Sequence, residues 1–172
     1  MRDTIRQRGT VRMALVPFIF VGWAATAVAM TAVITVSVST LVPLLVLAAG
    51  FEAIFALHLN VERIGRFLQV YHEPQGGWEH VAMAFGQRYK GSGPDPLFVQ
   101  LFVFAASLNF LPVTLVAEDV AEVVVLALVH LVFVYRIRTA RATVARQRAE
   151  DLERFAAIRR ETDTAPPAPT TP

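Results

Sequence analysis

The sequence contains no cysteine among its 172 residues. This absence excludes disulfide bonds, thiolate zinc sites, iron–sulfur clusters and haem attached covalently through a C-x-x-C-H motif. Charge is also scarce, since Asp, Glu, Lys and Arg make up only 17% of the chain while hydrophobic residues make up 55%. Two long stretches, 13–62 and 91–135, contain no lysine or arginine. The long apolar runs within these stretches indicate membrane-spanning segments rather than the core of a soluble domain.

Four apolar segments approach the length of about 20 residues that a spanning helix needs. The sequence therefore predicts an all-α bundle of four transmembrane helices, with spans at about 13–37, 41–62, 96–117 and 119–136 and a membrane domain over 13–137. The N-terminus, with its basic residues before an apolar run, has features of a secretory signal. The run is longer than a signal core of about 7–15 residues, so we interpret it as a retained first helix.

The basic residues predict the orientation of these spans. All 16 fall in the segments 1–12, 63–90 and 136–160, while the other two connections are uncharged or acidic. Four spans place every basic residue on one side, which the positive-inside rule identifies as the cytoplasm. Both termini are then cytoplasmic. The basic residues are explained by topology and by contact with anionic lipid, without a nucleic-acid partner.

Helical periodicity is expected to continue beyond two of the spans. Apolar residues recur at helical spacing in 61–73 and in 136–160, which predicts cytoplasmic helical extensions of spans two and four, the latter forming a helix over 138–161. The cytoplasmic loop 67–95 contains a further short helical segment. The Pro- and Thr-rich end, 162–172, is predicted to be disordered.

The polar side of span two holds the main candidate site, formed by Glu52 with Glu62, Arg63 and Arg66. Counted from Arg63 at the cytoplasmic edge, Glu52 lies roughly 16 Å inside the membrane. A carboxyl at that depth is expected to be protonated or hydrogen-bonded. We take Asn109 in span three as its leading partner, and Ser or Thr of span one as further candidates. Glu52 is then either a proton-handling group or, as its isolation favours, a structural clasp.

Two histidines suggest a cofactor hypothesis. His58 in span two and His130 in span four have nearly equal predicted depths, as in a bis-histidine b-type haem held between helices. The simpler alternative is that each histidine hydrogen-bonds to its neighbours. No metal site is predicted, because Glu52 is separated along the helix from His58 and Glu62.

No catalytic residues are predicted, because phosphate-binding, dinucleotide-binding, zinc-protease and nucleophile-elbow motifs are missing. We expect a non-enzymatic accessory or scaffolding subunit that meets a protein partner, or a second copy, through its cytoplasmic helices. Two alternatives are a small proton-coupled transporter that uses Glu52 and an electron-transfer subunit with haem b on His58 and His130.

Overall fold

The computed structural model describes residues 2–32, 36–73, 76–89 and 95–164, and these residues are helices joined by short connections without any strand. In chain order the elements are α1 (Arg2–Thr31), the short 3-10 helix η1 (Ser37–Thr40), α2 (Leu41–Tyr71), α3 (Trp78–Arg88), α4 (Val99–Phe110), α5 (Val113–Val116) and α6 (Val120–Thr164). Four segments are long and apolar enough to cross a membrane: one in α1, one in η1–α2, one in α4–α5 and one in α6.

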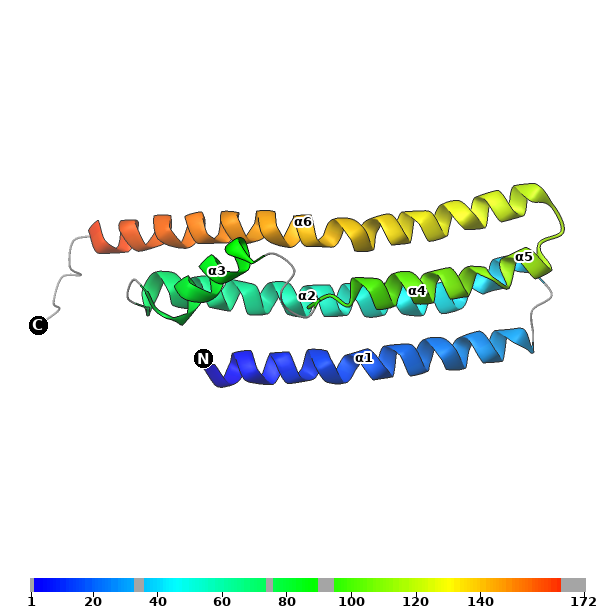
Figure 1. Cartoon of the computed structure of the whole chain (residues 1–172), viewed down its shortest axis with the longest axis horizontal. Coiled ribbons are helices and arrows are strands. Elements are labelled where there is room, and N and C mark those ends of the chain that lie inside the picture. Colours follow the sequence, from blue (N-terminus) through cyan, green and yellow to red (C-terminus); the bar gives the residue numbers. More distant parts are fainter. Residues whose placement is uncertain (1, 33–35, 74–75, 90–94, 165–172) are drawn as a thin grey trace, which may run out of the picture.

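The long helices lie lengthwise beside one another, with α2 and α4 between α1 and α6 (Figure 1). The chain reverses direction after each of them, so α2 and α6 run in the same direction while α1 and α4 run in the opposite one. We call the end that holds η1 and α5 the hairpin end. The opposite end, where α2 and α6 finish beside α3, is called the basic end.

Aromatic rings from all four long helices form the centre of the packing. The Phe51 ring of α2 lies 5.3 Å from Phe102 of α4 and 6.3 Å from Phe133 of α6, measured between ring centroids. The Phe20 ring of α1 lies 5.1 Å from Phe102. Phe51 and Phe102 are fully buried. Edge-to-face contacts of this kind add to the packing energy of the apolar area, so these rings fix the heights of the helices relative to one another.

Gly50 allows α1 to approach α2 closely. A Cβ atom at this position would collide with the side chain of Ile19, whereas one at Gly22 would make only an ordinary contact with Val46. Small residues at helix interfaces permit this kind of backbone approach. The Ile19–Gly50 contact therefore sets the level of α1 along α2.

The third apolar segment, predicted as a span over about 96–117, consists of two helices. α4 ends at Phe110, and α5 begins after Pro112. Proline has no backbone N–H to donate to the preceding turn, which accounts for the interruption. At its other end the segment begins at Asp95, whose carboxylate accepts hydrogen bonds from the backbone N–H groups of Leu97 (3.2 Å) and Val99 (2.6 Å).

Both predicted extensions are helical. α2 continues to Tyr71, and α6 continues without interruption to Thr164. The first three residues assigned to the tail, 162–164, therefore belong to α6, while the rest of that assignment lies outside the described residues. The short helical segment of the loop is α3, and α1 ends at Thr31, earlier than the predicted boundary of span one.

Candidate functional site

A series of ion pairs joins α2 to α6 along the segment of α2 from Glu52 to Arg63. Glu52 pairs with Arg136 at 2.8 Å, Glu62 with Arg148 at 2.6 Å, and Arg63 with Asp151 at 3.0 Å. The partners are 84, 86 and 88 residues apart in sequence. This nearly constant separation is what two parallel helices in contact produce. We call these three contacts the ion-pair ladder.

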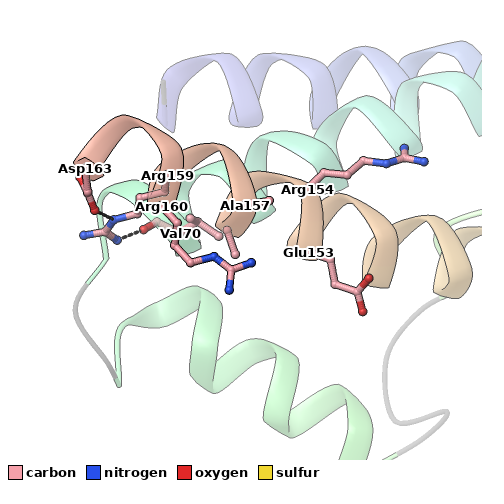
Figure 2. A pocket seen from close by; sticks show the side chains of 8 residues that line it. Val70, Glu153, Arg154, Ala157, Arg159, Arg160 and Asp163 are labelled. Carbon is pink, nitrogen blue, oxygen red and sulfur yellow. Dashed lines mark hydrogen bonds and ion pairs between the residues drawn. The ribbon is translucent and has the colours of Figure 1, made fainter. Parts of the chain in front are cut away.

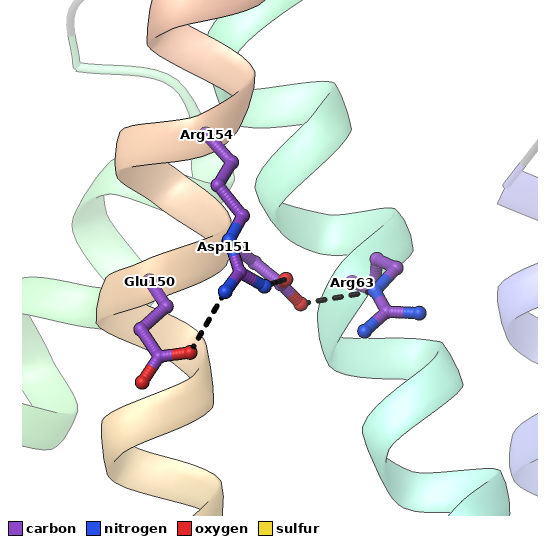
Figure 3. A network of polar contacts seen from close by, with 4 residues as sticks. All are labelled: Arg63, Glu150, Asp151 and Arg154. Carbon is purple, nitrogen blue, oxygen red and sulfur yellow. Dashed lines mark hydrogen bonds and ion pairs between the residues drawn. The ribbon is translucent and has the colours of Figure 1, made fainter.

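The basic-end part of the ladder belongs to a wider polar network (Figure 3). The Asp151 carboxylate accepts a hydrogen bond from Arg63 Nε and lies 3.8 Å from Arg154, which also pairs with Glu150 at 3.2 Å. Each exposed pair contributes only about 0.2–1 kcal/mol, but a connected network restricts the geometry more than isolated pairs do. The rings of Phe67 and Phe155 pack edge to face beside it, with centroids 5.7 Å apart.

Beyond this network a hollow of about 920 Å³ lies between the last turns of α2 and α6. Figure 2 shows its charged lining on α6, where Arg159 reaches the backbone carbonyl of Val70 and lies 3.7 Å from Asp163. Arg154, Arg160 and Glu153 also line it. The basic end thus presents a shallow, mixed-charge surface formed mainly by α6, with Val70 as its contact on α2.

α3 is attached to α2 through buried polar side chains. Arg66 donates from Nη1 to Gln69 Oε1 (2.9 Å) and to the sulfur of Met83 (3.2 Å), and Gln69 Nε2 lies 3.2 Å from His80 Nδ1. Arg66 and Gln69 are both buried. Arg66 therefore faces α3, whereas Glu62 and Arg63 face α6, so the predicted polar side of span two is divided between two neighbours.

Glu52 does not have the partner that was expected. Its carboxylate accepts a hydrogen bond from Arg136 Nη2, and its side chain is 51% exposed, whereas Asn109 bonds elsewhere. The predicted contact between a buried Glu52 and Asn109 is therefore wrong for this structure. The error came from using Arg63 to set the membrane edge. α6 is shifted so that its first basic residue lies beside Glu52, eleven residues before Arg63.

Asn109 is the centre of a buried clasp at the hairpin end. Its Oδ1 accepts a hydrogen bond from Trp23 Nε1 (3.1 Å), and its Nδ2 donates to the Thr40 carbonyl (3.0 Å) and contacts His130 Nε2 (3.2 Å). Because an amide NH₂ group can only donate, His130 Nε2 accepts and Nδ1 carries the proton, which it donates to the Leu126 carbonyl at 2.8 Å. The Asn109 clasp therefore joins α1, η1, α4 and α6.

The two histidines are not brought together. Glu52 is level with Arg136, so His58, six residues after Glu52, and His130, six residues before Arg136, are separated by roughly 18 Å along the helix axes. His58 instead lines a hollow of about 420 Å³ with Leu97 and Arg141. Both ring nitrogens of His130 are engaged within the Asn109 clasp. The geometry therefore does not provide one iron with both histidines as ligands.

In the described part of the chain, no group of three or more His, Asp or Glu side chains is arranged to hold a metal ion. Comparisons with family models, curated proteins and solved structures found no match for this chain. The candidate sites therefore remain the ion-pair ladder with its charged hollow and the Asn109 clasp, both argued from geometry alone.

Proposed function

We propose that the protein is a four-pass integral membrane protein, a helical bundle whose basic end faces the cytoplasm together with both termini. Four apolar segments of sufficient length support the crossings. The confinement of lysine and arginine to 1–12, 63–90 and 136–160 supports the orientation. Apolar side chains are exposed along α1, α4 and α6, as lipid-facing surfaces require.

Within that arrangement the protein acts as a non-enzymatic accessory or scaffolding subunit. Its docking surface is the cytoplasmic platform, which we define as α3 together with 61–71 of α2 and 138–164 of α6. The observation that carries this proposal is the ion-pair ladder, because Glu62–Arg148 and Arg63–Asp151 hold the last part of α6 against α2. A charged helix end without such ion pairs would move independently of α2. Held by the ion pairs, the end of α6 presents a constant surface to a partner protein.

The charged hollow is the part of the platform that best suits a partner. It is open, shallow and lined by both signs of charge, including Glu153, Arg154 and Arg160. A peptide segment carrying acidic and basic side chains would be complementary to it, and such complementarity mainly provides specificity and faster association. The partner is thus expected to be a protein segment at the cytoplasmic surface of the membrane.

Site-specific photocross-linking in living cells tests this function. A photoreactive amino acid at Ile158, an exposed residue of the platform, should give a discrete adduct with another protein. The matched control is Leu131, an exposed residue of the same helix within its apolar part, which should give only lipid adducts or a weak background. Absence of any protein adduct at Ile158, or the same adduct at both positions, would refute the scaffolding proposal.

The two alternative functions have separate readouts. A proton-coupled transporter should produce a proton flux in liposomes that Glu52→Gln abolishes. A haem subunit should show a Soret band after purification. The pairing of Glu52 with Arg136 and the separation of His58 from His130 give neither alternative a geometric basis.

A further inference from the structure

The Glu52–Arg136 pair lies within the apolar belt of the proposed membrane domain. On α6, Arg136 is five residues before Arg141, which pairs at 2.9 Å with Asp95, the residue that begins the third apolar segment. The Glu52–Arg136 pair therefore lies roughly 7.5 Å deeper in the apolar belt than the Arg141–Asp95 pair. The position of α1 indicates a similar depth. Ile19 packs on Gly50, and α1 runs antiparallel to α2, so Arg12, seven residues before Ile19, is level with Leu57, seven residues after Gly50. Leu57 lies five residues beyond Glu52.

The pair is also open to the surroundings of the chain. The side chain of Glu52 is 51% exposed and that of Arg136 is 35% exposed. The Arg136 guanidinium is held against α2, over the ring of Phe55 at 4.4 Å from the centroid and near Phe51 at 5.8 Å. In this arrangement both charges therefore stay at the level of Phe51 to Phe55 of α2, within the apolar belt.

Charged side chains at membrane depth nearly always face protein or a water-filled cavity, because hydrocarbon cannot solvate them. Here they face outward, from a surface that is otherwise apolar or small. We call this surface the α2/α6 face; its other exposed residues are Leu45, Ala49 and Ala56 of α2 and Val125, Val129 and Val132 of α6. The apolar residues alone would be satisfied by lipid, so it is the ion pair that requires a cover.

We propose that a second copy of this chain covers the α2/α6 face, related by a two-fold axis that places Glu52 of each copy opposite Arg136 of the other. In a two-fold interface the same patch meets itself, so any covering surface must complement its own charges. An adjacent carboxylate and guanidinium meet this condition. The two-fold axis places the two ion pairs antiparallel, so each carboxylate lies next to the guanidinium of the other copy as well as that of its own chain. Alanines at positions 49 and 56 allow the two α2 helices to approach closely.

This inference uses the membrane placement but does not depend on the cytoplasmic scaffolding function. The interface lies in the apolar belt, away from the cytoplasmic platform. Failure of the dimer would leave the photocross-linking result at Ile158 unaffected, and the reverse also holds.

The lack of cysteine makes disulfide cross-linking a clean test. Ala49→Cys lies one turn from Glu52 on the same side of α2. Phe104→Cys on α4 is a control of similar depth, since Phe102 packs beside Phe51, and it is exposed on a different surface. In liposomes containing few copies per vesicle, Ala49→Cys should form covalent dimers at least about tenfold faster than Phe104→Cys. Equal rates, or no dimer at position 49 in neutral and anionic lipid alike, would overturn the proposal.

A charge exchange identifies the atoms that make the interface. The double variant E52R/R136E keeps the pair within each chain and is self-complementary, so it should form dimers with itself. Mixed with the unaltered chain, it places Arg against Arg and Glu against Glu. Copurification of two differently tagged chains should therefore succeed for like pairs and fall about tenfold, equivalent to ~1.4 kcal/mol, for the mixed pair. Equal recovery of the mixed pair would show that these charges do not meet across a dimer.

Discussion

Asn109→Ala is expected to lower the free energy of unfolding by roughly 2–5 kcal/mol. The substitution removes three contacts that hold different helices together, to Trp23, the Thr40 carbonyl and His130. Interhelical hydrogen bonds within membranes contribute about 0.6 kcal/mol on average and up to about 1.7 each, so three of them give this range. The measurement is unfolding in mixed detergent micelles, followed by helix content.

The control for this change lies two residues away on the same helix. Ser107 is exposed, and its hydroxyl bonds only to the Val103 carbonyl of its own helix at 2.9 Å, so Ser107→Ala should leave stability nearly unchanged. Asn109→Asp should be no more stable than Asn109→Ala, because a carboxylate has no N–H to donate to the Thr40 carbonyl and adds a charge to a buried site. If Asn109→Ala were as stable as Ser107→Ala, the clasp would have no role in holding the helices.

Glu52→Gln is expected to destabilise the protein. If Glu52 were instead a neutral carboxyl that donates a hydrogen bond, glutamine would replace it with little effect. The amide leaves the Arg136 guanidinium without its anionic partner inside the apolar belt. Inserting an unpaired arginine at the centre of a spanning helix costs about 2.5–3.5 kcal/mol, and at the shallower level of Arg136 we expect up to about 2.5. Unfolding in mixed micelles measures this effect.

The double variant E52Q/R136Q provides the comparison for the ion pair. With both charges removed, no uncompensated ion remains, and stability should recover most of what Glu52→Gln loses. A non-additive cycle of this kind is the expected sign of direct coupling between neighbours. If E52Q/R136Q lost the sum of the two single effects, Glu52 and Arg136 would not interact.

The positions of the long helices could be read from the sequence because each depends on local patterns. Apolar runs without lysine or arginine located the four segments, and helical spacing in 61–73 and 136–160 predicted the continuation of α2 and α6. The break at Pro112 could have been anticipated more firmly, since an internal proline removes a backbone donor. The membrane orientation remains a prediction that rests on charge.

The partners within the candidate sites could not be read from the sequence because they depend on how far one helix slides along another. Depth in span two was counted from Arg63 and depth in span four from Arg136, as if these two residues were level, which made His58 and His130 appear level; Asn109 was matched to Glu52 because both were expected at mid-depth. The actual shift of α6 pairs Glu52 with Arg136 and sends His130 to Asn109. One signal was present: the spacing from Glu52 to Glu62 on α2 is close to that from Arg136 to Arg148 on α6.

Trp23 and the Thr40 carbonyl were missed for a different reason. Indole N–H groups are common at membrane interfaces, and a backbone carbonyl has no sequence signature. Their role follows only from the approach of α1 and η1 to α4 at the hairpin end.

A double cysteine variant tests directly whether α2 and α6 continue side by side to form the proposed cytoplasmic platform. Because the side chains of Phe67 and Phe155 meet, with ring centroids 5.7 Å apart, a short bifunctional thiol reagent should link F67C/F155C within one chain in native membranes. The control F67C/R146C places the second cysteine nine residues earlier on α6, roughly 13.5 Å away along the axis, and should remain unlinked. Rapid, complete cross-linking of F67C/F155C alone is the predicted result. A variant that stays unlinked, or cross-links no faster than the control, would show that the two helices separate at the basic end.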